Sequence, residues 1–414
     1  MQKTDTIEIM APAGSFAALQ AAIQAGADSV YFGIEKLNMR SRSSKNFTIS
    51  DLKKIVDITR NKGVKSYLTL NSVIYDEDIE LMQEIVDVAH DSGVTAIIAS
   101  DLAVMQYARQ KNVEIHMSTQ ANISNIEAVK FYSQFADVVV LARELNLDQI
   151  QAITKQIKEN KITGPSGDLI QVEIFAHGAL CMAISGKCYL SLHQYNHSAN
   201  RGDCLQACRR SYIVTDKDTG QELEIDNENI MSPKDLCTIH FINKILDAGV
   251  SVLKLEGRAR SPEYVKTVTE CYKEAAQAYI DGTYTEAKIK DWKARLKTVF
   301  NRGFWDGYYL GQKLGEWTHK YGSQATQKKI FVGPVTNYFS NIQVGEFYSE
   351  ANNLEKGDKL LIIGPTTGVV EITLDEVRID DQEVERVPQN AEFSIPVDTK
   401  LRRSDKLYKI VKKE

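Results

Sequence analysis

The chain has 414 residues, of which 43% are hydrophobic and 25% charged, and its formal net charge is −5. This composition is typical of a globular protein and excludes a disordered or fibrous chain, while the length predicts one large domain and a smaller one. The first residues contain no apolar run of signal-peptide length, and no later run is long enough to span a membrane. We therefore expect a cytoplasmic protein without a membrane partner.

From Thr6 to about Arg258 the sequence alternates short β-branched runs with helical patterns, which predicts repeated βα units and a parallel sheet. Segments 15–25, 79–92 and 148–159 have apolar residues at helical spacing. Eight units of this kind predict an α/β fold, a closed (β/α)8 barrel of the TIM type. The eight predicted strands are residues 7–11, 29–33, 64–70, 96–100, 113–118, 137–142, 170–176 and 250–256.

The connection between the seventh and eighth predicted strands, residues 177–249, is much longer than usual and contains five of the six cysteines. Gly178 is expected to let the chain turn sharply into this cysteine-rich insert. Six cysteines are too few for a disulfide scaffold in a chain of this size, and without a secretion signal we expect a reducing compartment. The clustering of the cysteines therefore needs another explanation.

After the eighth strand the pattern predicts a closing helix at 262–280, a second helix at 285–299 and an ordered connection at 301–308 that is rich in glycine and aromatic residues. From about residue 328, short alternating strands predict a small antiparallel β-barrel. These strands are expected at 330–338, 343–348, 359–363, 368–377, 392–396 and 407–411. We divide the chain into a barrel domain at 1–320, insert included, and a small β-barrel domain at 321–414.

The insert cysteines form the strongest motif, Cys181-x6-Cys188 followed by Cys204-x3-Cys208 and then Cys237. Thiolates that converge from one loop bind a soft metal or a cluster. Structural zinc sites favour short, paired C-x2-4-C motifs, and the first gap is wide for zinc, whereas iron–sulfur clusters accept more varied spacing. The alternative is a group of buried free thiols, which is how we interpret Cys271, in a predicted helix.

Polar residues at the carboxyl ends of the predicted strands form the second group, because chemistry in this fold takes place at that end of the barrel. Charged groups there are costly to bury unless they are paired or bind a ligand. The catalytic candidates are Glu173, His177, Lys254, Glu256 and Arg258. The candidates for substrate binding are Arg40, Arg42, Asn71, His116, Gln120 and Arg143.

Each of these assignments has an alternative. Arg40 and Arg42 lie in the loop after the second strand, where they can hold a carboxylate or phosphate or else be solvated surface charge. Charged residues at the strand ends can also simply pair with one another. The sequence contains no G-x-S-x-G, H-E-x-x-H or Walker motif and no dinucleotide fingerprint after the first strand, and no nucleophile for a protease stands out.

Several segments resemble the signature of the collagenase-like peptidase family of unassigned catalytic type, peptidase family U32, and the resemblance covers nearly the whole chain. The cysteine-containing matches are EIFAHGALC at 173–181, SGKCYLS at 185–191, NRGDC at 200–204, CR at 208–209 and SPKDLC at 232–237. Further matches are APAG at 11–14, YFG at 31–33, STQ at 118–120 and KLEGR at 254–258. A barrel followed by one small β-barrel is most similar to the bacterial tRNA hydroxylation branch.

The resemblance implies a 4Fe-4S cluster bound by Cys181, Cys188, Cys204 and Cys237, with Cys208 as a competing ligand. It also implies hydroxylation of a tRNA wobble uridine, with prephenate, a dicarboxylate, as source or enabler of the hydroxyl group. The residues expected to hold its carboxylates are Arg40, Arg42, Arg143, Lys254 or Arg258. Basic segments and the C-terminal barrel are expected to position the tRNA. The alternatives are a true protease and a noncatalytic scaffold in which the cluster only staples the insert; the oligomeric state is left open.

Overall fold

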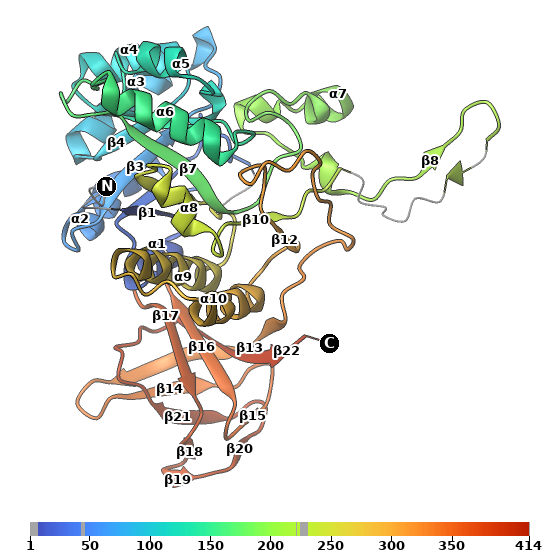
Figure 1. Cartoon of the computed structure of the whole chain (residues 1–414). Coiled ribbons are helices and arrows are strands. Elements are labelled where there is room, and N and C mark those ends of the chain that lie inside the picture. Colours follow the sequence, from blue (N-terminus) through green and yellow to red (C-terminus); the bar gives the residue numbers. More distant parts are fainter. Residues whose placement is uncertain (1–6, 43–45, 221, 224–230, 414) are drawn as a thin grey trace.

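The structure is a computed structural model that describes residues 7–42, 46–220, 222–223 and 231–413, so residues 221 and 224–230 of the predicted insert lie outside the described part. Eight parallel strands form the predicted barrel (Figure 1). They are β1 (Glu8–Pro12), β2 (Ser29–Phe32), β3 (Lys65–Leu70), β4 (Ala96–Ala99), β5 (Glu114–Met117), β6 (Val138–Val140), β7 (Gln171–Gly178) and β11 (Val252–Leu255). Because β11 pairs with both β1 and β7, the barrel is closed, and this prediction is confirmed.

Helices surround the barrel, and several begin at a side-chain cap. Ser15, Asp101 and Asn125 each accept a hydrogen bond from a backbone N–H in the first turn of the helix that follows. The helices are α1 (Phe16–Gln24), α2 (Leu52–Arg60), α3 (Ile79–Ser92), α4 (Leu102–Gln110), α5 (Ile126–Tyr132), α6 (Leu147–Glu159), α7 (Leu190–Tyr195), α8 (Ile242–Asp247), α9 (Pro262–Ile280) and α10 (Glu286–Thr298). Short 3-10 helices span Ile49–Asp51, Asp76–Asp78, Thr119–Ala121, Ala199–Arg201 and Ala207–Arg209.

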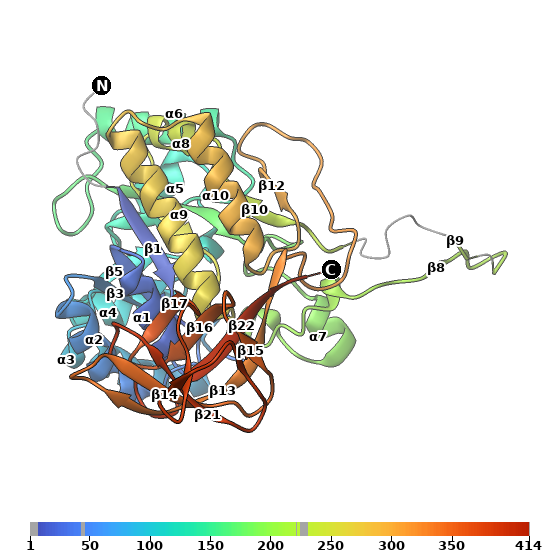
Figure 2. The ribbon, with the colours of Figure 1, turned by 90° about the horizontal axis from the view of Figure 1, so that it is seen from below.

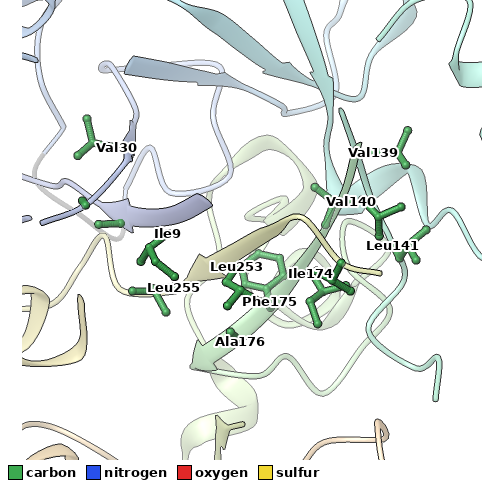
Figure 3. Close-up of a cluster of buried hydrophobic side chains, with 14 of the residues drawn as sticks. Ile9, Val30, Val139, Val140, Leu141, Ile174, Phe175, Ala176, Leu253 and Leu255 are labelled. Carbon is green, nitrogen blue, oxygen red and sulfur yellow. The ribbon is translucent and has the colours of Figure 1, made fainter. Parts of the chain in front are cut away.

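The side chains of the barrel strands alternate between the helices and the barrel interior. Figure 3 shows outward residues such as Val30, Ile174 and Leu253, which belong to the hydrophobic core between the strands and the helices. A second buried cluster, which includes Met10 and Tyr31, contains residues from the alternate positions. We call the carboxyl end of the barrel its mouth. Polar residues at inward positions near the strand ends therefore face the mouth.

The connection between β7 and β11 leaves the barrel and returns to it. A short hairpin, β8 (Val214–Thr215) and β9 (Glu222–Leu223), projects from the body of the molecule in Figure 1. The chain returns through β10 (Asp235–Cys237), which pairs antiparallel with β7 and parallel with β12 (Phe304–Trp305). Gly178 has a φ of +101°, and a Cβ there would lie 2.4 Å from the backbone oxygen of Glu256. The expected sharp turn into the insert therefore requires glycine.

The six antiparallel strands predicted for the last part of the chain are present as β13 (Gln327–Phe339), β14 (Val344–Tyr348), β16 (Lys359–Gly364), β17 (Gly368–Thr373), β21 (Glu392–Pro396) and β22 (Lys406–Lys412). The structure adds four strands of two residues each that were not predicted: β15 (Leu354–Glu355), β18 (Arg378–Ile379), β19 (Gln382–Glu383) and β20 (Arg386–Val387). Eight of these strands form one sheet in the order β17-β16-β22-β13-β14-β21-β18-β19. Within the described residues the two end strands do not pair, so the observed arrangement is an open sheet around its own hydrophobic core.

This sheet packs on the flank of the barrel beside α1 and α9, as Figure 2 shows from below. The Gln24 side chain donates to the carbonyl of Thr367 at 2.8 Å and accepts from the amide of Val369 at 3.0 Å. Lys329 of β13 pairs with Glu263 of α9 at 2.8 Å. The sheet is therefore anchored on the helices. In the described part of the chain, no helix is both long and apolar enough to cross a bilayer.

Candidate active site at the barrel mouth

A carboxylate surrounded by arginines lies at the end of β11. Glu256 accepts hydrogen bonds from the Tyr31 hydroxyl at 3.1 Å and from Nη2 of Arg40 at 3.2 Å. Burial raises the pKa of the Glu256 carboxyl, but the charges of Arg40, Arg143 and Arg258 outweigh burial and hold that pKa below its usual value. Glu256 is therefore ionised at neutral pH.

Arg258 is fixed two residues further along the chain. Its Nη1 donates to Oδ1 of Asn38 at 3.1 Å and to Oγ1 of Thr69 at 2.9 Å. Gly33 leaves the room for this guanidinium, because a Cβ at that position would lie 2.3 Å from Nη1. Burial lowers the pKa of Arg258 to about 10, so the side chain is still charged at neutral pH. It supplies positive charge to the mouth while its Nη1 bonds Asn38 and Thr69.

Arg143 has a hydrogen-bonding atom without a partner. Its guanidinium lies 3.7 Å from the ring centre of Phe175, and its Nη1 donates to the backbone oxygen of Ala179 at 3.1 Å. The Nε atom is buried, and no described residue accepts its hydrogen bond. Burial lowers the Arg143 pKa, with the Glu256 carboxylate acting in the opposite direction. A planar cation with an unused donor is suited to an anionic ligand.

Asn71 and Gln120 bond each other beside these charges. Nδ2 of Asn71 donates to Oγ of Ser118 at 3.1 Å and to Oε1 of Gln120 at 3.0 Å. Gly186 of the insert lies directly against Gln120, because a Cβ on Gly186 would be 2.5 Å from Cγ of that side chain. The two predicted binding residues are thus brought together, and Gln120 contacts the cysteine-containing insert.

Lys254 and Glu173 form an ion pair inside the barrel. Nζ of Lys254 lies 2.7 Å from Oε1 of Glu173, and the two side chains are only 6% and 0% exposed. The ammonium group is also 4.7 Å from the ring centre of Tyr31. For these two catalytic candidates the structure shows the alternative expectation, in which charged groups pair with one another.

Two predicted binding residues have partners other than Glu256. Nε2 of His116 lies 2.9 Å from Oε1 of Glu114, and its ring centre is 4.5 Å from that of Tyr67, near the amino-terminal ends of the strands. Arg42 pairs with Asp203 of the insert at 2.9 Å and is largely exposed. Arg42 is therefore a surface charge that contacts the insert, which is closer to the second alternative, solvated surface charge, than to anion binding.

His177 is also turned away from the mouth. The strand register shifts between Lys254 and Leu255, opposite His177. The imidazole lies among aromatic rings, 5.4 Å from the centre of Tyr272 and 5.6 Å from that of Phe304. Burial lowers the His177 pKa to about 3. Its position on the α9 side does not support the catalytic role expected from the sequence.

This neutral histidine predicts a pH-dependent stability. The folded-state pKa of about 3 lies below the ordinary 6.5, so the unfolded chain binds the proton first as the pH falls. Stability is then lost between pH 6.5 and 3, by up to about 1.4 kcal/mol per pH unit. The melting temperature of His177→Gln should therefore fall less between pH 7 and pH 5 than that of wild type. Thermal unfolding followed by circular dichroism measures both. The exposed His90→Gln variant is the control, and equal losses in wild type and His177→Gln would contradict the assignment.

Four cysteines lie close to one another at the edge of the mouth. Cys181 is exposed, whereas Cys188, Cys204 and Cys208 are partly exposed. Burial raises the pKa of the Cys208 thiol, and the other three thiols raise it further by electrostatic repulsion. The guanidinium of Arg40 interacts with two of the same thiols. The thiols therefore lie beside the arginines of the mouth.

Cys237, which the family resemblance implies as the fourth ligand, has different neighbours. It is 1% exposed, belongs to the hydrophobic core and interacts with the Tyr272 hydroxyl on α9. Burial raises its pKa to about 11, so it is a protonated thiol at neutral pH. The structure thus groups Cys208, the alternative ligand, with the other three. Among the described residues, no three His, Cys, Asp or Glu side chains already stand at metal-binding distances.

Residues that the sequence analysis did not single out hold this segment in place. Arg209 donates to the carbonyl of Pro233 at 2.6 Å and to Oγ of Ser232 at 3.1 Å. Asn200 accepts from the amide of Cys188 at 3.2 Å through Oδ1, and its own carbonyl accepts from Val73 at 3.1 Å. Arg209 and Asn200 lie within segments that resemble the family signature, and this resemblance could have pointed to them. Their partners could not be found in this way, because they lie elsewhere in the sequence.

Comparisons with known proteins agree with the resemblance. The sequence profile described as Peptidase family U32 matches residues 14–319. A protein of Porphyromonas gingivalis named collagenase is 62% identical over 98% of each chain. The tRNA hydroxylation protein P1 of Bacillus subtilis is 33% identical over 86% of this chain and 83% of its own. The 23S rRNA 5-hydroxycytidine C2501 synthase of Escherichia coli is 33% identical over 75% of this chain and 46% of its own.

Proposed function

Since the chain belongs to peptidase family U32, we propose that it is an iron–sulfur-dependent enzyme that hydroxylates the wobble uridine of tRNA. Two relatives named for RNA hydroxylation are each 33% identical to it. The observation that carries the proposal is the group of four thiols beside a barrel mouth in which three arginines surround an ionised Glu256. A soft-metal donor set next to an anion-binding mouth is suited to redox chemistry on a charged substrate.

The chemistry of the four thiols supports a 4Fe-4S cluster as the cofactor. Cys181, Cys188, Cys204 and Cys208 supply the four thiols that such a cluster requires, and Arg209 and Arg40 interact electrostatically with members of this set. Neighbouring positive charge favours the thiolate form, which is the form that binds iron. When bound, the cluster would supply one-electron chemistry at the mouth.

Arg143, Arg258 and Glu256 have different roles in binding a small dicarboxylate, which by family resemblance is prephenate. Arg143 has the unused buried donor and is the residue that would contact a carboxylate. Arg258, bonded to Asn38 and Thr69, adds long-range attraction. Glu256 orients Arg40 through their hydrogen bond. The protein's own contribution is therefore binding and orientation of an anion next to the thiols.

A protease is the other reading that needs a test, because the Porphyromonas relative is named collagenase. In the described residues at the mouth, no serine, threonine or cysteine bonds a histidine. Ser118 bonds Asn71 and Gln120, and Thr69 bonds Arg258. His177 and His116 point elsewhere. The pairing of nucleophile and base that peptide hydrolysis uses is not formed among these residues.

The test measures hydroxylated uridine in digested tRNA by mass spectrometry, in a bacterial strain that lacks its own hydroxylation proteins and expresses this chain. Wild type should restore the modified nucleoside, and Glu256→Gln should lower it by at least about tenfold because Arg40 loses its charged partner. Glu376→Gln, on the surface of the C-terminal sheet, is the matched control. Collagen cleavage by wild type without any modified uridine would contradict the proposal.

A further inference from the structure

The insert carries an unusual concentration of exposed apolar side chains. Of the seventeen large hydrophobic residues exposed in the described part of the chain, seven lie between positions 182 and 213. They are Met182, Ile184, Tyr189, Leu192, Tyr195, Leu205 and Ile213. Exposed apolar side chains that are concentrated in one segment indicate a surface that binds a partner or a ligand.

The charge of the same segment indicates what kind of partner it binds. Residues 181–213 contain four lysines or arginines and one aspartate, although the whole chain has a formal net charge of −5. Lys187 and Arg210 are exposed. Positive charge interleaved with aromatic rings is typical of surfaces that bind single-stranded nucleic acid, where bases stack and phosphates pair with cations.

The geometry of α7 presents two of the aromatic rings together. Tyr189, Leu192 and Tyr195 follow each other at a spacing of three residues, which places them on one side of this short helix. Tyr189 is 69% exposed. Arg210 donates a hydrogen bond to the Tyr195 hydroxyl, and its guanidinium lies 4.9 Å from the centre of that ring. Exposed aromatic rings and a guanidinium group are therefore available to RNA on the same part of the insert.

The same surface lies next to the candidate cluster thiols. Tyr189 directly follows Cys188 in sequence, and α7 packs against the 3-10 helix Ala207–Arg209, which contains Cys208. In Figure 1 this part of the insert lies beside the end of the barrel at which β7 finishes. A loop of RNA held on this surface would bring one nucleotide close to the mouth.

We propose that the insert face, defined as Lys187, Tyr189, Leu192, Tyr195 and Arg210, binds the single-stranded loop of the RNA substrate, an inference that rests on the proposed function. Bases stack on Tyr189 and Tyr195, and Lys187 and Arg210 neutralise phosphates. The nucleotide to be modified then leaves the stacked loop for the mouth.

The experiment measures fluorescence anisotropy of a labelled tRNA anticodon stem-loop with the full chain, purified without oxygen, at two salt concentrations. Tyr189→Ala should weaken binding about tenfold, within the range for loss of one stacked base. Arg210→Glu should weaken it and also reduce its salt dependence. The control is Phe131→Ala, which likewise removes an exposed ring, here on α5, and Arg403→Glu, the same charge reversal, tests the basic C-terminal cluster as the rival binding site.

The outcomes separate this inference from the proposed function. If wild type does not bind the stem-loop, the proposed function itself is contradicted. If wild type binds, and Arg403→Glu abolishes binding while Tyr189→Ala and Arg210→Glu do not, RNA lies on the C-terminal sheet and the insert face is overturned alone. It is also overturned if Tyr189→Ala leaves RNA affinity unchanged and converts an oligomer to a monomer in sedimentation, since the face is then a protein interface.

Discussion

Cys208→Ser is expected to abolish the binding of iron and acid-labile sulfide, whereas Cys237→Ser is expected to leave both in place. Cys208 is partly exposed and interacts with the other three thiols of the insert. Cys237 is buried in the core next to Tyr272. The ligands of one cluster must all lie within reach of the same iron–sulfur core, so the two variants should give opposite results.

The measurement is iron and sulfide content with the visible spectrum, on protein purified without oxygen. Cys271→Ser, at a buried cysteine of α9 outside the insert, controls for loss of a core thiol, and far-ultraviolet circular dichroism shows whether each variant folds. The ligand assignment would be reversed if a folded Cys237→Ser protein lost its iron while Cys208→Ser kept all of its iron. The set expected from the sequence, Cys181, Cys188, Cys204 and Cys237, would then be the correct one.

Glu173→Gln is expected to destabilise the protein by about 3 to 5 kcal/mol, the usual cost of leaving one member of a buried ion pair without its partner. The pair with Lys254 is almost completely buried, and the ammonium group would be left facing the rings of Tyr31 and Phe175. Removing both charges in Glu173→Gln with Lys254→Met should recover most of the lost stability.

Thermal unfolding followed by circular dichroism measures this effect. The exposed pair of Lys53 and Asp57 on α2 is the matched control, and Asp57→Asn should change stability by less than about 1 kcal/mol. If Glu173→Gln melts like wild type while modified tRNA is lost, the pair serves the reaction and not the stability of the barrel. If the double variant is less stable than Glu173→Gln, the charges are not coupled.

The barrel strands were predictable because each is a short apolar run bounded by turns, and apolar character is required on both faces of a strand inside this fold. Glu256 and Arg258 were predictable for the same reason, since they directly follow such a run. Their partners were not, because Asn38, Thr69 and Tyr31 come from other strands and loops. Pairings of this kind depend on the three-dimensional order of the strands.

The direction of His177 and the grouping of the cysteines were not predictable for a related reason. A register shift between β7 and β11 lies opposite His177, and the antiparallel pairing of β10 with β7 places Cys237 opposite His177. Neither feature leaves a mark in residue spacing. The sequence also could not show whether the C-terminal strands close into a barrel. Alternation of polar and apolar residues predicts strands, but it does not predict whether the first and last of them pair.

The pairing of β11 with β1 also has a consequence for synthesis of the protein on the ribosome. Glu8 pairs with Val252, so the barrel stays open until nearly the whole of it has been translated. Until then Glu173 has no cation, and the oxygens of Asn38 and Thr69 have no donor from Arg258. The last strand delivers Lys254, Glu256 and Arg258 together. An open nascent barrel therefore has no formed mouth, and its electrostatic centre is completed in the same step that closes the fold.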